Sequence, residues 1–153
     1  RLPSCSAHWE SHVPAFPFIS LTAALRLLRL VTPALFMLHA LVRIANGSIP
    51  QFGEFMESAG FPNGVAVVWA ITVAELGAGL GLMVGYRIRL MAAVLFGIAA
   101  TGIVLIHRHQ GWFVGEHGTG GSEYSVALLC MLVVVAATAE ERAGLGVSRV
   151  AST

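Results

Sequence analysis

One carboxylate in the middle of a long apolar run has the clearest chemical potential in this chain. Glu75 lies near the centre of residues 64–85, which are otherwise apolar or small. An ionised carboxylate is costly in an apolar interior, so such a group is either kept neutral or given a partner. Two interpretations stay open: Glu75 is a proton carrier or ligand contact, or it is a neutral side chain hydrogen-bonded between helices for structure.

A polar stripe on an earlier apolar run offers partners for this carboxylate. Thr32, His39 and Arg43 recur at spacings of seven and four residues, which places them along one side of a helix. We expect Glu75 to face this first helix or a central cavity. His39 is a candidate for proton exchange or for an interhelical hydrogen bond, and Arg43 is a candidate ligand contact or an anchor at the membrane interface. The helix positions that share the side of Glu75 are Val68, Thr72, Gly79 and Leu82.

A further set of polar side chains lies in residues 107–124, which hold half of the histidines. We predict that His107, Glu123 and Tyr124 join Arg43 in one ligand-binding pocket. Tyr124 could instead anchor the chain at the membrane interface, and Glu123 could interact with a helix dipole. A haem held between His39 and His107 is an alternative. No metal site is expected, because Glu-x-x-His motifs of the di-iron type are absent.

The elements that must position these groups are long apolar helices. The chain is 56% hydrophobic and only 11% charged, unlike an ordinary soluble domain. A membrane-spanning helix needs about 20 mainly apolar residues. We therefore predict an all-α, integral membrane four-helix bundle with spans at residues 21–45, 64–85, 90–107 and 124–139.

The arginines predict how this bundle is oriented. The chain has no Lys and no Asp, and its net charge of +1 gives no reason to expect a nucleic-acid partner. By the positive-inside rule both termini and the turn near residue 86 are cytoplasmic, because most arginines flank these segments. The arginines on that side are Arg26, Arg29, Arg87, Arg89, Arg142 and Arg149, against Arg43 and Arg108 on the other.

The chain divides into one domain and two tails. We expect a flexible N-terminal tail over residues 1–19, a transmembrane domain over residues 20–142, and a C-terminal tail over residues 143–153. Cys5 lies in the first tail and Cys130 in the last span. Because the two are not closely spaced in the sequence, we do not expect a thiol redox pair, and we interpret Cys130 as a small packing residue.

Small residues predict how two of the helices pack. Gly77, Gly81 and Gly85 recur every four residues on the second span, and Ala93, Gly97 and Thr101 do so on the third. Such ridges let two helix backbones approach closely. Because the connecting turn is very short, we expect these helices to be antiparallel neighbours whose ridges meet.

Several short motifs, taken in order, resemble the DoxX family of small bacterial membrane proteins. They are LRLLRL at residues 25–30, FMLHAL at 36–41, AELGAGL at 74–80, GYR at 85–87, GWF at 111–113 and GSEYS at 121–125. The resemblance implies a four-helix protein of the bacterial inner membrane, and many members are labelled oxidoreductases without a demonstrated reaction. The positions that match its recurrent polar pattern are Arg29, His39, Glu75, Glu123 and Tyr124.

Our first hypothesis is a membrane subunit of a redox system that binds a quinone or similar lipophilic molecule. Glu75 and His39 would exchange protons, and a soluble or membrane redox partner protein would bring electrons, because the chain shows no CxxC, no dinucleotide-binding glycine pattern and no cluster ligands. The alternative is a non-catalytic membrane scaffold that recruits partner proteins. A small transporter ranks third, since four helices would require a homo-oligomer, which the sequence leaves open.

Overall fold

The computed structural model describes residues 19–106, 111–113 and 121–150, with side chains of the last helix described as far as Ala139. Helices are the only regular elements among these residues, which confirms the all-α prediction. In chain order the helices are α1 (Leu21–Ala45), α2 (Ile49–Ser58), α3 (Gly64–Val84), α4 (Ile88–Leu105) and α5 (Glu123–Val150).

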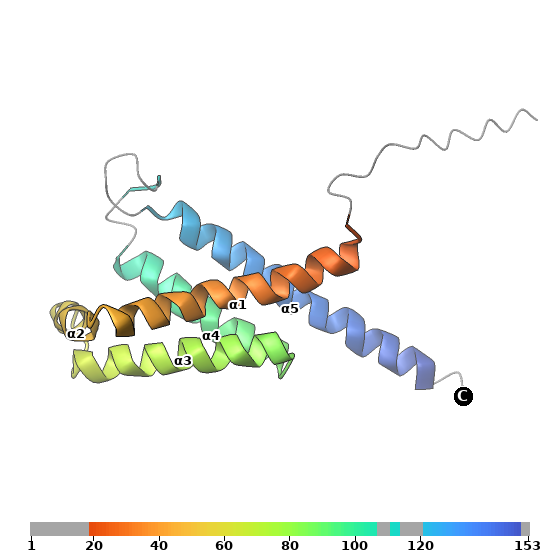
Figure 1. The fold of residues 1–153 in the computed structure, drawn as a ribbon, viewed down its shortest axis with the longest axis horizontal. Coiled ribbons are helices and arrows are strands. Elements are labelled where there is room, and N and C mark those ends of the chain that lie inside the picture. The colour runs from red at the N-terminus through yellow and green to blue at the C-terminus, as the bar shows by residue number, and fades with distance from the viewer. Residues whose placement is uncertain (1–18, 107–110, 114–120, 151–153) are drawn as a thin grey trace, which may run out of the picture.

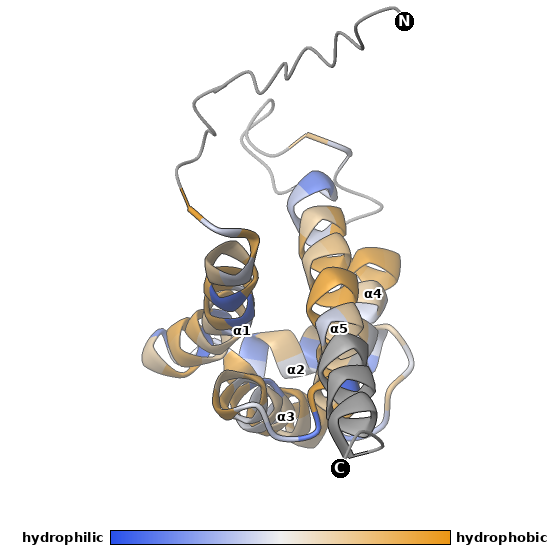
Figure 2. Cartoon of the chain, turned by 90° about the vertical axis from the view of Figure 1, so that its right-hand side faces the viewer, coloured by the Kyte–Doolittle hydropathy of each residue, from blue (hydrophilic) through white to orange (hydrophobic). Residues whose placement is uncertain are grey.

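The long helices run back and forth along one direction. In Figure 1, α1 runs away from the N-terminal end, α3 returns beside it, α4 runs out again, and α5 returns toward the C-terminal end. Three of them, α1, α3 and α4, are long and apolar enough to cross a membrane. Figure 2 shows their ribbons mainly in the colours of hydrophobic residues. The chain is therefore a multi-pass membrane protein.

The bounds of the last helix, α5, differ from the predicted ones. Its described apolar part, Glu123–Ala139, is shorter than the other three spans, so a fourth crossing stays a prediction. The helix also continues to Val150, through most of the segment that we expected to be a C-terminal tail. Residues 139–145 are rich in Ala, Glu, Arg and Leu, which favour helix in their own right. The expected N-terminal tail lies, apart from Ile19, outside the described residues.

The short helix α2 was not predicted from the sequence. It lies across the end of the bundle, nearly end-on in Figure 1, where the long helices lie lengthwise. Ile49, Gly53 and Met56 form its buried side, at helical spacing, while Glu54 and Glu57 are exposed. Ten residues are too few to span a bilayer, but this amphipathic pattern lets α2 cover the bundle end.

A close backbone approach fixes α2 against the start of α3. A Cβ atom on Gly64 would collide with the carbonyl oxygen of Gly53, and a Cβ atom on Gly53 would lie 2.8 Å from the backbone nitrogen of Val65, so both positions need a hydrogen in place of a side chain. The Gly64 amide donates a hydrogen bond of 2.9 Å to Oε1 of Glu57. α2 is thereby held at one place along α3.

A second close approach joins α1 and α3. A Cβ atom on Gly79 would lie 2.5 Å from Cγ of Met37 and 3.4 Å from the carbonyl oxygen of Pro33. Pro33 lies inside α1, where it removes a helical hydrogen bond to the carbonyl of Arg29. The glycine therefore lets α3 pass close to α1 where the latter carries its proline.

The packing of α3 and α4 corrects one expectation. The two helices are antiparallel neighbours joined by a tight turn, as predicted, with Gly85 and Arg87 both at positive φ. Gly81 does face α4, since a Cβ there would lie 2.8 Å from Sδ of Met91. The predicted meeting of two ridges is wrong, however, because nothing lies within 4 Å of a Cβ on Gly77 or Gly97. Ala93 and Thr101 are exposed as well.

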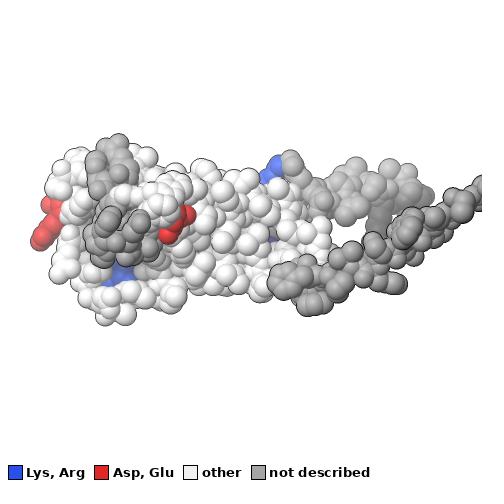
Figure 3. All heavy atoms as spheres, turned by 90° about the horizontal axis from the view of Figure 1, so that it is seen from above, with Lys and Arg blue, Asp and Glu red and all other residues white. Residues whose placement is uncertain are grey.

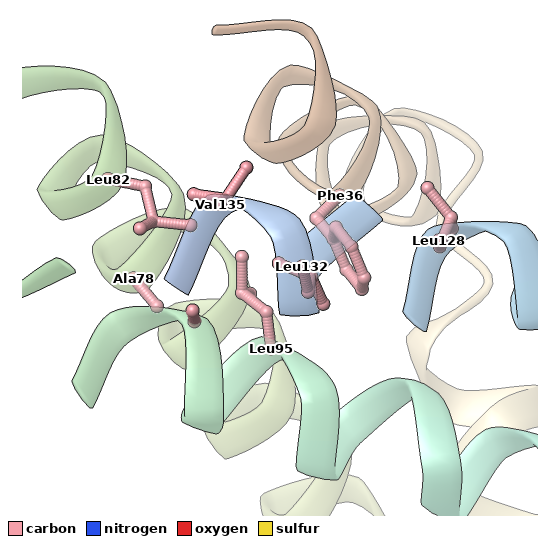
Figure 4. Packing of buried hydrophobic residues seen from close by; sticks show 8 residues of the cluster. Phe36, Ala78, Leu82, Leu95, Leu128, Leu132 and Val135 are labelled. Atoms are coloured by element: carbon pink, nitrogen blue, oxygen red, sulfur yellow. The ribbon is translucent and has the colours of Figure 1, made fainter. Parts of the chain in front are cut away.

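Four helices contribute to the main hydrophobic core. Phe36 of α1, Leu82 of α3, Leu95 of α4, and Leu132 and Val135 of α5 are all nearly inaccessible to solvent. Figure 4 shows these side chains converging between the helices. The core ties α5 to the other three long helices. On the face in Figure 3, the Arg and Glu side chains fall into two groups, one toward each end of the bundle, with uncharged surface between them.

Candidate functional site

An ion pair joins α1 and α3 inside the bundle. Nη1 of Arg43 lies 2.8 Å from Oε2 of Glu75, and the two side chains are only 15% and 5% exposed. The same Nη1 donates a hydrogen bond of 2.9 Å to Oγ1 of Thr72. The expectation that Glu75 faces the first helix is confirmed. Arg43 therefore turns into the protein and does not act as a simple interface anchor.

The neighbours of this pair complete its hydrogen bonds. Oγ1 of Thr72 donates 2.8 Å to the carbonyl of Val68, one turn earlier in α3, while it accepts from Arg43. From α2, the ring of Phe52 lies with its centroid 5.5 Å from Cζ of Arg43, within the range of a cation–π interaction. The residues expected to share the side of Glu75 are all buried with it: Val68, Thr72, Gly79 and Leu82.

A large cavity adjoins the ion pair. Its volume is about 1020 Å³, which is at the upper end of the range for ligand sites. Its walls are mainly apolar, and every helix contributes to them. The main apolar lining residues are Phe36, Phe52, Met56, Phe61, Ile71, Val94, Ile98, Leu105 and Leu128.

The cavity brings together most of the side chains singled out from the sequence. Arg43, Glu75 and His39 line it from α1 and α3, and Glu123 and Tyr124 line it from the start of α5. His39 is exposed and lies within electrostatic range of Glu75. The catalytic and ligand-binding roles of these residues stay predictions. His107, and with it the haem alternative, lies outside the described residues.

Two other polar residues of α1 do not belong to this site. Thr32, expected on the same stripe as His39 and Arg43, is fully buried and does not line the cavity. Arg29 lies toward the other end of the bundle, where its Nη1 is 3.7 Å from the Cβ position of Gly85. Among described residues, neither Nε of Arg29 nor Oγ1 of Thr32 has a hydrogen-bond partner. Within residues 19–106, 111–113 and 121–139, no three His, Cys, Asp or Glu side chains come together as a metal site.

Sequence reasoning missed the contribution of α2. Phe52 and Met56 line the cavity, and Phe52 contacts the arginine, yet neither stood out in the sequence. The available signal was the apolar spacing of Ile49, Phe52 and Met56 after Pro50, a residue that is common at the start of helices.

The two buried threonines provide a matched test of the hydrogen-bond network. We expect Thr72→Val to lower the free energy of unfolding by about 1–3 kcal/mol, because Arg43 loses an acceptor in a buried place. Thr32→Val should leave it unchanged or raise it, since that hydroxyl has no partner to lose. Reversible unfolding in mixed detergent micelles measures both values. Equal losses for the two variants would contradict the assignment.

The fold and the site define a class of protein: a multi-pass helical membrane protein with a buried ion pair beside an apolar cavity. The chain belongs to the DoxX family, whose model matches residues 24–108. That match covers α1 to α4 almost completely and includes Arg43 and Glu75, but it ends before Glu123 and Tyr124. No curated protein matches the chain, and no solved structure does.

Proposed function

We propose that this DoxX family protein is the membrane subunit of a redox system and binds a quinone, or a similarly lipophilic molecule, in the cavity. The observation that supports the proposal is an apolar cavity of about 1020 Å³ with the Arg43–Glu75 pair on its wall. A quinone ring needs apolar walls together with a few polar groups for its carbonyl oxygens. Arg43 and His39 are the donors that the cavity offers from α1.

Proton exchange is the role that we assign to Glu75 and His39. Reduction of a quinone to a quinol consumes two electrons and two protons, so a site of low polarity must supply titratable groups. Glu75 lies beside Arg43, and His39 is exposed at the cavity. The electrons come from a reduced redox partner, a soluble or membrane protein, and the protons pass through these two side chains.

The same helices support a proposal for the placement in the cell. We propose the bacterial inner membrane, with both termini and the α3–α4 turn on the cytoplasmic side and α5 as the fourth span. The basis is the distribution of arginines, since Arg26 and Arg29 open α1 and Arg87 and Arg89 flank the start of α4. The site then lies in the outer half of the membrane, near the end covered by α2.

Binding of a short-chain quinone to the purified protein in lipid nanodiscs tests the proposal. We expect saturable binding to the wild type and about tenfold weaker binding to Glu75→Gln, which keeps the size of the side chain but removes its charge. Glu54→Gln, a change on the exposed side of α2, is the control and should bind like the wild type. Absence of saturable binding to the wild type would contradict the proposal.

A scaffold that recruits partner proteins is the second candidate, and one observation favours it. The hydrogen bonds of Arg43 to Glu75 and Thr72 tie α1 to α3, which is what a purely structural polar network would do. In that case a variant with both Arg43 and Glu75 replaced by Met should still copurify with the partners of the wild type. Loss of partners together with loss of quinone binding would instead favour the redox subunit.

A further inference from the structure

We propose that the ligand enters the cavity sideways from the bilayer, between α1 and the first turns of α5, and that it is a long-tailed molecule whose polar head lies beside Arg43 while its tail extends into the lipid. This inference rests on the proposed function and specifies the class of its ligand.

The helix arrangement leaves a side of the bundle open. α3 packs against α1, α2 and α4, and α4 packs against α5. α1 also contacts α5, where Phe36 shares the core with Leu132, whereas α1 and α4 do not form a packed pair among the described residues. In Figure 2, α1 stands on one side and α4 with α5 on the other, with α2 and α3 below and between them. The cavity is lined from both sides of this separation, by His39 of α1 and by Thr101 and Ala127 of α4 and α5.

The residues at the rim are exposed, and those of α1 and α4 belong to helices long and apolar enough to cross a membrane. His39, Gly97, Thr101, Tyr124 and Ala127 all line the cavity and are all exposed. His39 lies six residues before the end of α1, about 9 Å along the helix axis. A side chain that is exposed on the flank of the bundle at that depth faces the hydrocarbon chains of the lipid and not water. The cavity therefore communicates with the bilayer.

A route from water along the bundle axis would lead past apolar side chains. At the end covered by α2, the cavity wall is made by Phe52, Met56 and Phe61, and Met56 is 3% exposed. Phe52 and Met56 belong to α2, which covers that end, and the ring of Phe52 contacts Arg43. A polar, water-soluble ligand would have to pass them, whereas a lipid-dissolved ligand meets only lipid on its way in.

The polar groups determine which end of such a ligand enters first. His39 makes no hydrogen bond to another described residue, and an imidazole that faces hydrocarbon with only its electrostatic interaction with Glu75 is in an unfavourable place. A head with hydrogen-bonding oxygens satisfies His39 and then reaches Arg43, while the apolar tail stays among Gly97, Ala127 and the lipid. The ligand class is thus a lipid with a compact polar head and a single long tail.

The experiment compares two quinones with the same head, one with a long isoprenoid tail and one without a tail, in nanodiscs that contain the full chain. We expect occupancy by the long-tailed quinone to follow its mole fraction in the lipid and to persist when the sample is diluted with buffer. Ala127→Phe at the rim should slow its association about tenfold relative to the tailless quinone. Ala137→Phe, at an exposed position of α5 that does not line the cavity, should leave both rates unchanged.

The outcomes separate this inference from the proposed function. If the tailless quinone binds and the long-tailed one does not, the site is reached from water and lateral entry is wrong, while the proposed function stands. If both bind and Ala127→Phe has the same effect as Ala137→Phe, entry between α1 and α5 is wrong. If neither quinone binds the wild type, the proposed function fails as well.

Discussion

Replacing Arg43 by Met is expected to lower the free energy of unfolding by about 3–5 kcal/mol, the largest effect of a single substitution in this protein. The change removes the partner of Glu75, which is only 5% exposed, and it leaves Thr72 without its donor. A carboxylate left alone in an apolar interior must either stay charged at high cost or take up a proton. Unfolding by increasing detergent fraction in mixed micelles measures the loss.

Two further variants distinguish the effect of losing the whole ion pair from the effect of leaving one charge unpaired. Replacing Arg43 and Glu75 together by Met should recover most of the loss, because no unpaired charge remains and the two side chains can pack. Arg26→Met, at an exposed position near the start of α1, should change stability by less than about 0.5 kcal/mol. A double variant as unstable as Arg43→Met would show that the ion pair itself, and not the unpaired carboxylate, determines stability.

Filling the cavity is expected to have the largest effect on binding. Gly97 lies on the cavity wall, and nothing lies within 4 Å of a Cβ atom placed on it. Gly97→Phe therefore places its ring in the cavity without disturbing the helix backbone. We expect quinone affinity to fall at least about tenfold, with the fold intact. Equilibrium binding in nanodiscs, together with the unfolding transition, measures both properties.

Gly77→Phe is the control for this change. Gly77 is also in the middle of an apolar helix and also has open space at its Cβ position, but it does not line the cavity. The helix propensity of the two positions changes in the same way. Quinone affinity should therefore be preserved in Gly77→Phe. Equal losses of affinity in both variants would mean that the ligand does not occupy this cavity.

The long helices were predictable because hydropathy marks them directly. The predicted span at residues 21–45 coincides with α1, and those at 64–85 and 90–107 differ from α3 and α4 by one or two residues. A bilayer requires long uninterrupted apolar runs, so their positions follow from the sequence with little influence from tertiary contacts. The start of α4 was missed because Ile88 and Arg89 directly follow the turn.

Packing between helices was less predictable. Small residues at a four-residue spacing allow a close approach but do not say to which neighbour, and in α4 Gly97 and Thr101 line the cavity. The close approach that the structure does show, at Gly79, depends on Met37 and Pro33 of a helix far away in sequence. α2 escaped prediction because ten residues of mixed polarity between two spans resemble an ordinary loop.

Most residues of the candidate site could be predicted from the sequence, but not which of them form the ion pair. The position of Glu75 in an apolar run required a partner, and helix periodicity pointed to the stripe of Thr32, His39 and Arg43. Which of these three side chains contacts Glu75 depends on how far α1 is shifted along its axis relative to α3. No local sequence pattern encodes that axial shift. The cavity was equally hidden, because it results from the separation of α1 and α4.

The most direct test of the central claim is photolabelling of the wild-type protein in nanodiscs with a quinone that carries a photoreactive group on its head. We predict labelling, abolished by excess unlabelled quinone, on residues 36–43 of α1 and 94–105 of α4, which contribute lining residues to the cavity. Labelling on the outer side of α3, at exposed residues such as Val73 and Leu80, or labelling that excess quinone does not reduce, would contradict the account.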